Sequence, residues 1–159
     1  MPLPQWTAER LLPPGRHRSD LADIYERLVF NAPNQNAREI LFSALNAYLG
    51  AVAKVIPTGR ALIGGTFITA TTSTPAGVDV VLIPEDWGGL KRSGKSTRDA
   101  LYGMLTLRGA IIGQPATYLD FIQPVSGLLD GFLCFPGDEE VWETAWSRNN
   151  SRGFPEIAW

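Results

Sequence analysis

Cysteine and histidine are almost absent from this 159-residue chain, which contains one of each, Cys134 and His17. A single thiol excludes an internal disulfide framework and any metal site built from several thiolates. A single imidazole argues equally against a histidine-based zinc site. The common disulfide-stabilised and zinc-binding classes are therefore excluded.

The sequence also lacks a basic excess and a long apolar run. It has 14 Lys and Arg against 16 Asp and Glu, a formal net charge of −2, whereas a non-specific nucleic-acid surface needs a basic excess. No apolar run approaches membrane length, and the N-terminus lacks the charged-then-apolar pattern of a secretion signal. We therefore expect a cytoplasmic protein with no membrane partner and no strong nucleic-acid surface.

The composition itself is that of a globular domain. Apolar residues make up 45% of the chain and charged residues 19%, values typical of folded proteins. A chain of this length predicts a single domain over residues 1–159. Four prolines before residue 19 predict an irregular N-terminal arm over 1–18. The tail, 149–159, is also predicted to be irregular.

One long amphipathic helix is the clearest element in the pattern. From Gln35 to Val55, apolar residues recur at helical spacing and form one stripe, while polar residues such as Arg38 lie off it. The stripe consists of Ala37, Ile40, Leu41, Ala44, Leu45, Tyr48, Leu49 and Val52. Shorter helices are predicted to begin near Ser19, at Ser96 and after Asp138, with a loop over 84–95.

Two apolar runs predict neighbouring core strands. The first begins at Ala61 and ends in Gly64-Gly65-Thr66, and the second covers Val78 to Ile83. Asp79 is the one acid in the second run, and a lone acid on a central strand is costly unless it is partnered or near solvent. A functional carboxylate is the main interpretation of Asp79, and a cap on a neighbouring loop is the alternative.

The rest of the sheet is predicted from weaker signals. A third strand is expected over 117–122, with Asp120 on the same face as Tyr118 and Ile122. Residues 124–137 are turn-rich. The predicted fold class is α/β, a small mixed β-sheet flanked by helices.

Small residues at the end of the first strand suit phosphate chemistry. Gly64, Gly65 and Thr66 allow backbone N–H groups to approach a phosphate closely. A carboxylate on the next strand that faces the same way, such as Asp79, is where a nucleotide-bound Mg²⁺ would be held. The two segments together predict a site for a magnesium-bound nucleotide.

The spacing of these segments resembles that of nucleotidyltransferases of the DNA polymerase beta type. Those enzymes carry Gly-Ser, about ten residues and then Asp-x-Asp, and this chain has Gly65-Thr66, ten residues, and then Gly77-Val78-Asp79. The similarity is greatest to a small bacterial family of nucleotidyltransferase-like proteins. Its Leu-Pro-Pro-Gly, Gly-Ser-Phe-Val-Thr and Pro-x-Asp-Ile-Asp segments match Leu12–Gly15, Gly65–Thr69 and Pro75–Asp79. The resemblance covers roughly residues 11–125.

The resemblance implies a nucleotidyltransferase-like fold and a degenerate active site. It implies that Asp79 and Asp120 are catalytic carboxylates that hold Mg²⁺, and that Gly64, Gly65 and Thr66 contact the nucleotide. Gly77 replaces the first Asp of Asp-x-Asp, the ligand that bridges both metals in this superfamily. We therefore expect weakened Mg²⁺ binding and a nucleotide that is transferred slowly or not at all.

Two alternatives stay open. The same fold can serve as a non-catalytic scaffold, such as the antitoxin-like partner in a two-protein toxin–antitoxin system. The segment Gly89–Ser96 also fits the G-x-x-x-x-G-K-[ST] pattern of a phosphate-binding P-loop, with Lys95 as its lysine. Five residues, 84–88, separate this segment from the preceding strand, whereas a P-loop leaves its strand at once, so the P-loop is the weaker alternative.

Overall fold

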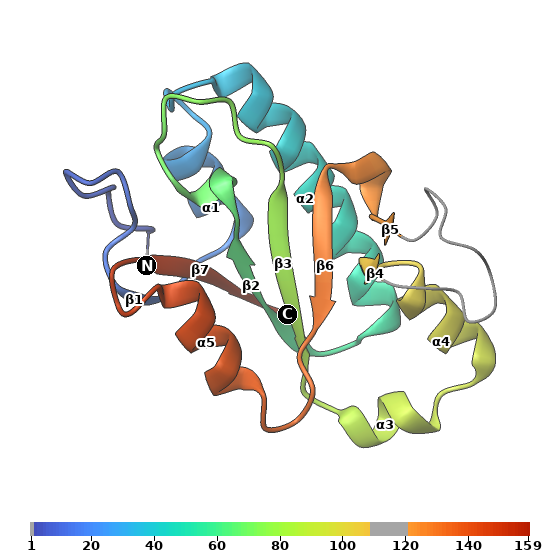
Figure 1. The fold of residues 1–159 in the computed structure, drawn as a ribbon. Coiled ribbons are helices and arrows are strands. Elements are labelled where there is room, and N and C mark those ends of the chain that lie inside the picture. The colour runs from blue at the N-terminus through green and yellow to red at the C-terminus, as the bar shows by residue number, and fades with distance from the viewer. Residues whose placement is uncertain (1, 109–120) are drawn as a thin grey trace.

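The computed structural model describes residues 2–108 and 121–159, and it has an α/β fold built on a mixed sheet of five strands (Figure 1). The order in the sheet is β1-β7-β2-β3-β6. These strands are β1 (Gly15–Arg18), β2 (Gly59–Gly64), β3 (Val78–Pro84), β6 (Leu129–Leu133) and β7 (Gly153–Ala158). A second, two-stranded sheet pairs β4 (Leu107–Arg108) with β5 (Phe121–Ile122).

Helices flank the five-stranded sheet. They are α1 (Leu21–Leu28), α2 (Gln35–Val55), α3 (Trp87–Arg92), α4 (Lys95–Tyr102) and α5 (Glu139–Ser147), with 3₁₀ turns η1 (Thr66–Ile68) and η3 (Val125–Gly127). A Cβ placed on Gly131 of β6 would overlap the Tyr48 hydroxyl of α2, and one on Gly64 of β2 would overlap the Trp146 ring of α5. Figure 1 shows that α2 and α5 lie on opposite faces of the sheet. Within the described residues, no helix is both long and apolar enough to cross a membrane.

The predicted long helix and the two predicted core strands are confirmed. Helix α2 has the predicted bounds, and β2 and β3 pair antiparallel, with Gly64 opposite Asp79. Strand β3 lies between β2 and β6 and is therefore an interior strand, next to the edge strand β6. Apart from Asp79, which is half-buried, every residue of β3 is buried. This burial on both faces explains why the run is almost wholly apolar.

The apolar stripe of α2 differs from the prediction at two positions. Ile40 is 58% exposed, whereas Arg38 is fully buried. The Arg38 guanidinium donates to the carbonyls of Phe67 at 2.6 Å, Leu28 at 3.1 Å and also Thr69. Helical periodicity gives no sign of this role, because the partners are backbone groups from distant segments. Arg38 ties the segment after β2 to the helix.

The N-terminal arm and the C-terminal tail are more regular than predicted. Gly153–Ala158 form β7 in the interior of the sheet, and Gly15–Arg18 form β1 beside it, so the prediction of an irregular tail is wrong. Pro155 argues against a strand in the sequence, because proline lacks the backbone N–H that donates hydrogen bonds within a sheet. The register between β7 and β2 covers Glu156 to Ala158, and Pro155 lies beyond it, opposite His17 of β1.

Two segments predicted as loops also contain regular structure. Residues 84–95 contain α3, whose first turn is capped by the Asp86 carboxylate, an acceptor for the Gly89 N–H at 2.8 Å. Residues 124–137 contain β6. Asp130-Gly131 has the composition of a turn, but Gly131 is required in this strand because the Tyr48 hydroxyl and the Met104 carbonyl occupy the place of a side chain.

Candidate functional site

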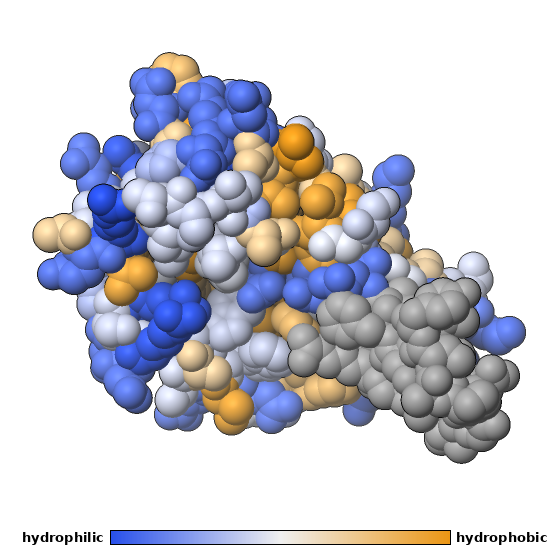
Figure 2. Space-filling view, turned by 45° about the horizontal axis from the view of Figure 1, so that its top comes forward, coloured by the Kyte–Doolittle hydropathy of each residue, from blue (hydrophilic) through white to orange (hydrophobic). Residues whose placement is uncertain are grey.

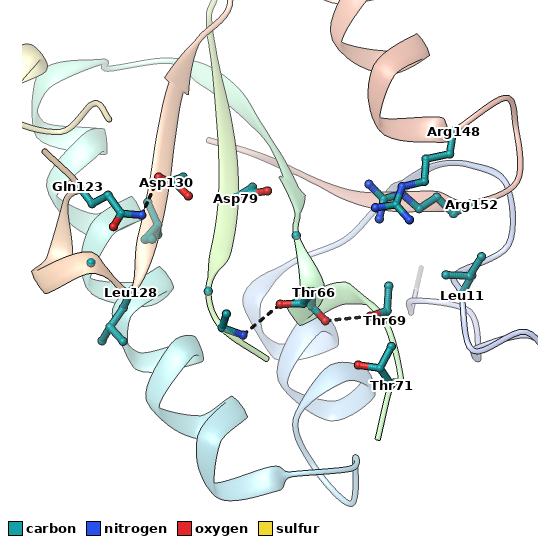
Figure 3. A pocket seen from close by; sticks show the side chains of 15 residues that line it. Leu11, Thr66, Thr69, Thr71, Asp79, Gln123, Leu128, Asp130, Arg148 and Arg152 are labelled. Carbon is teal, nitrogen blue, oxygen red and sulfur yellow. Dashed lines mark hydrogen bonds between the residues drawn. The ribbon is translucent and has the colours of Figure 1, made fainter. Parts of the chain in front are cut away.

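A cleft of about 650 Å³ lies at the end of the sheet where β2 ends and where β3 and β6 begin. Its lining comes from the turn after β2, the first residues of β3 and β6, and the segment between α5 and β7 (Figure 3). The lining residues are Leu11, Gly65, Thr66, Thr69, Thr71, Ala76, Gly77, Asp79, Gln123, Gly127, Leu128, Leu129, Asp130, Arg148 and Arg152. In Figure 2 this end of the sheet is tilted toward the viewer, and hydrophilic side chains cover much of the visible surface.

Gly65 is the residue that brings the backbone close to Asp79. Its φ of 83° and ψ of −171° lie in a region that is essentially reserved for glycine. An added Cβ would lie 3.3 Å from Cγ of Asp79 and 3.2 Å from the Gly77 carbonyl. A side chain at this position would therefore meet both a strained backbone and a crowded carboxylate.

Thr66 holds the shape of the turn. Its hydroxyl oxygen accepts the backbone N–H of Ala76 at 3.1 Å, and its carbonyl accepts the Thr69 hydroxyl at 3.0 Å (Figure 3). These bonds connect the end of β2 with the segment that leads into β3. The structure thus gives Thr66 a positioning role in the wall of the cleft.

Asp79 has a carboxylate neighbour that sequence reasoning missed. Strands β3 and β6 pair in parallel with Asp79 opposite Asp130, and residues opposite each other on neighbouring strands project from the same face of a sheet. Both line the cleft. The Asp130 carboxylate accepts hydrogen bonds from the Thr106 hydroxyl and from the Gln123 amide, each at 2.9 Å. The two aspartates thus lie on neighbouring strands at the edge of the cleft, with Asp130 turned toward Gln123 and Asp79 toward the opposite wall (Figure 3).

Two arginines form the opposite wall. Arg148 follows α5 and is exposed, and Arg152, just before β7, is only 8% exposed. Nε of Arg152 donates to the Trp146 carbonyl at 2.7 Å. Burial lowers the pKa of Arg152, the charge of Arg148 lowers it further, and Asp79 raises it. Figure 3 shows the two guanidinium groups together, on the side of the cleft toward which Asp79 points.

The predicted site residues are only partly brought together. Gly65, Thr66 and Asp79 line the cleft, whereas Gly64 does not and instead leaves room for the Trp146 ring. Asp120 lies outside the described residues. The described end of its predicted strand, β5, pairs with β4, and both sides of β3 are occupied by β2 and β6. Strand β6 is thus the second neighbour of β3, and the position of Asp120 relative to Asp79 stays a prediction.

Lys95 and the P-loop-like segment lie elsewhere. Gly89 lies inside helix α3, and Lys95 begins α4 with its side chain 87% exposed and 3.9 Å from Asp99. Both helices follow the far end of β3, opposite the end that carries the cleft (Figure 1). A phosphate-cradling loop between a strand and a helix is therefore not formed by Gly89–Ser96.

The donor set fits a metal that arrives with a ligand better than a metal held by the protein alone. Among the described residues, no three His, Cys, Asp or Glu side chains gather as a metal site. Mg²⁺ commonly binds through one or two carboxylates together with the phosphates of a substrate. Asp79 and Asp130 could supply such a pair.

The sequence around Asp130, Arg148 and Arg152 gives only weak indications that these residues line the cleft. Asp130 stands within Leu128–Phe132, an apolar segment that includes the turn-like Asp-Gly pair. Arg148 and Arg152 are four residues apart in a tail that reads as irregular. Only the pairing of β6 with β3, and of β7 with β2, brings these segments to the same end of the sheet.

The comparison with protein families gives one match that covers nearly the whole chain. The profile of DUF6932, a family of unknown function, matches residues 4–158, so the chain belongs to this family. The searches of curated proteins and of solved structures give no significant match.

Proposed function

We propose that this DUF6932 protein binds a magnesium-bound nucleotide in the cleft and has a nucleotidyltransferase-like fold, with weak or no transfer activity. The observation that supports this most is the register of Asp79 with Asp130 beside the Gly65 turn. Gly65 and Asp79 are the residues that the resemblance to nucleotidyltransferases singled out. A cytoplasmic setting is part of this proposal.

Asp130 takes the part that the sequence comparison gave to Asp120. A nucleotidyltransferase holds its metals with carboxylates from neighbouring strands, and Asp79 and Asp130 come from the adjacent β3 and β6. Thr106 and Gln123 fix the orientation of the Asp130 carboxylate through hydrogen bonds, as outer-shell partners do for metal ligands. The metal would then be shared between these carboxylates and the ligand's phosphates.

Gly77 is the reason to expect little or no transfer. It lines the cleft two residues before Asp79 and carries no side chain. In two-metal phosphoryl chemistry, the metal ions stabilise both the attacking and the leaving oxygen. With two carboxylates in place of three, Asp79 and Asp130 would hold a metal that arrives with the phosphates, which would serve binding better than transfer.

The test is calorimetric titration of ATP, GTP, CTP and UTP with and without Mg²⁺. We expect Mg²⁺ to raise the affinity of the wild type by at least about tenfold, or about 1.4 kcal/mol. Asp79→Asn and Asp130→Asn are each expected to lose this gain. Asp99→Asn, an exposed aspartate on α4, is the matched control and is expected to keep it.

Two other outcomes would reject the proposal. Nucleotide binding that Lys95→Ala abolishes and Asp79→Asn leaves intact would favour the P-loop alternative. Wild-type protein that binds none of the nucleotides at millimolar concentration would favour the scaffold or antitoxin-like function, in which the fold is kept without its ligand.

A further inference from the structure

The two cleft arginines, exposed Arg148 and buried Arg152, differ from the other arginines discussed above in their partners. Among the described residues, neither Arg148 nor Arg152 has a carboxylate within 4.0 Å. Arg38, which is also buried, is satisfied by four backbone carbonyls. Within the described residues, the Arg152 side chain has one such bond, from Nε to Trp146. A desolvated cation with so little compensation is costly.

The backbone between the two arginines holds them in this arrangement. Arg148, Asn149 and Asn150 all have positive φ, at 47°, 60° and 61°. A positive φ costs free energy in residues other than glycine, although asparagine tolerates this region better than most. The Ser147 carbonyl accepts the N–H groups of Ser151 at 3.0 Å and of Arg152 at 3.2 Å, which closes the turn. The strained turn places both guanidinium groups at one cleft.

We infer that Arg148 and Arg152 form an anion site that binds the polyphosphate chain of the ligand and does so without metal. This inference rests on the proposed function for the identity of the ligand as a nucleotide, but the anion site itself requires no Mg²⁺. The two walls of the cleft would then have different roles. The aspartates of β3 and β6 would contact the metal, and the arginines on the opposite wall would contact the phosphates.

The chemistry of the pair favours a chain of phosphates over a single one. A guanidinium presents parallel N–H donors that match two oxygens of a phosphate. Two guanidinium groups side by side suit two linked phosphates, whose negative charge offsets both cations. Asp79 and Asp130 on the other wall repel a bare anion, so the phosphates are expected to lie nearer to the arginines until a cation joins them.

The experiment uses inorganic tripolyphosphate, pyrophosphate and orthophosphate with the full chain in EDTA, followed by calorimetry and melting temperature. We expect tripolyphosphate to bind more tightly than pyrophosphate, and orthophosphate to bind weakest. Arg148→Gln is expected to lose at least about tenfold in tripolyphosphate affinity. The Arg148 side chain is exposed and makes no hydrogen bond within the described structure, so this variant is expected to retain the fold.

Matched variants sharpen the test. Arg98→Gln removes the same charge from an exposed position on α4 and is expected to bind tripolyphosphate as the wild type does. Asp79→Asn is expected to bind tripolyphosphate in EDTA roughly threefold more tightly, since a repelling charge is gone. The same variant loses the Mg²⁺-dependent gain for a nucleotide, so the two proposals predict opposite effects of one substitution.

Each outcome decides between the proposals. If the wild type binds no tripolyphosphate in EDTA, or if Arg148→Gln and Arg98→Gln lose equal affinity, the anion site is wrong. Binding of Mg-nucleotide that still depends on Asp79 would then leave the proposed function intact. If tripolyphosphate binds through Arg148 but neither a nucleoside nor Mg²⁺ adds affinity, the anion site is right and the proposed function is wrong.

Discussion

Two pairs of arginines flank helix α5, and their surroundings are opposite. Near the start of α5, Arg16 and Arg60 contact Glu139, Glu143 and Glu156. Nη1 of Arg16 lies 2.7 Å from Glu156, and Nη1 of Arg60 lies 2.7 Å from Glu139. At the other end of α5, no carboxylate of the described residues lies within 4.0 Å of the Arg148 or Arg152 guanidinium. We call these the paired cluster and the open pair.

The difference is visible in the acid–base properties of the side chains. The hydrogen bonds that Arg60 donates to Glu139 raise the pKa of Arg60. Burial lowers the pKa of Arg16, but hydrogen bonds with Glu143 and Glu156 outweigh it and raise the pKa overall. The pKa of Arg152 is lowered by burial and by Arg148. The paired cluster is balanced by three glutamates in close contact, whereas among the described residues Asp79 is the one acid whose charge raises the pKa of Arg152. A cation with so little compensation is typical of a binding site.

The largest effect on the unfolding free energy is expected when Glu156, the carboxylate that both arginines of the paired cluster contact, is replaced. Glu156→Gln removes the acceptor that both Arg16 and Arg60 contact, in a side chain that is almost wholly buried. The unfolding free energy is expected to fall by about 2–3 kcal/mol, measured by urea denaturation. Glu140→Gln, at an exposed position on α5, is the control and is expected to cost under about 0.5 kcal/mol.

Equal losses in these two variants would contradict the central place of Glu156.

The second prediction concerns a substitution that adds a carboxylate to the cleft, so that acids gather there as they do in the paired cluster. Gly77→Asp adds a third carboxylate, two residues before Asp79 and thus on the same strand face. Without metal, repulsion and the 3.1 Å approach of the new Cβ to the Leu128 carbonyl are expected to lower stability by about 1–2 kcal/mol. Mg²⁺ is expected to recover part of this loss, because it binds the folded state.

The melting temperatures of wild type and variant, each with and without Mg²⁺, measure this effect. A variant that is destabilised and indifferent to Mg²⁺ would show that the acids do not converge on a metal.

The paired cluster also predicts sensitivity to acid. Hydrogen bonding to Arg60 is the main cause that lowers the pKa of Glu139 from its ordinary value of 4.5. A lowered folded-state pKa stabilises the protein above about pH 4.5, and this contribution is lost as the pH falls through the folded-state value. Glu139 is partly exposed, so the contribution is about 0.5–1 kcal/mol.

Urea denaturation at pH 7 and pH 3 measures it. Glu139→Gln is expected to lose less stability than the wild type over this interval, and parallel pH profiles would count against the role of the Arg60 contact.

The smallest effect on the unfolding free energy is expected when one arginine of the open pair is replaced. Arg152→Gln removes a buried charge that forms no ion pair within the described part of the chain, so without ligand the unfolding free energy is expected to change by less than about 0.5 kcal/mol or to rise. Arg60→Gln is the comparison from the paired cluster and is expected to lose about 1–2 kcal/mol. Urea denaturation of both variants in EDTA tests this contrast. A larger loss for Arg152→Gln than for Arg60→Gln would overturn it.

Local patterns in the sequence were sufficient for the central elements. The bounds of α2 follow from helical spacing and from the Pro57 break, and β2 and β3 follow from apolar runs that turn residues interrupt. Asp79 was identifiable because a single acid in a buried strand requires an explanation. Gly65 was identifiable because its neighbours end a strand in small residues. These features are local, and the residues that cause them are adjacent in the chain.

The tertiary structure alone decided which distant residues share the cleft. Whether Asp79 meets Asp120 or Asp130 depends on which strand pairs with β3, and an apolar run does not encode its neighbour. Arg148 and Arg152 reach the site because β7 enters the sheet despite Pro155, which local propensity disfavours. Pairing of strands and burial of charge are properties of the whole chain, because each depends on contacts between segments far apart in sequence.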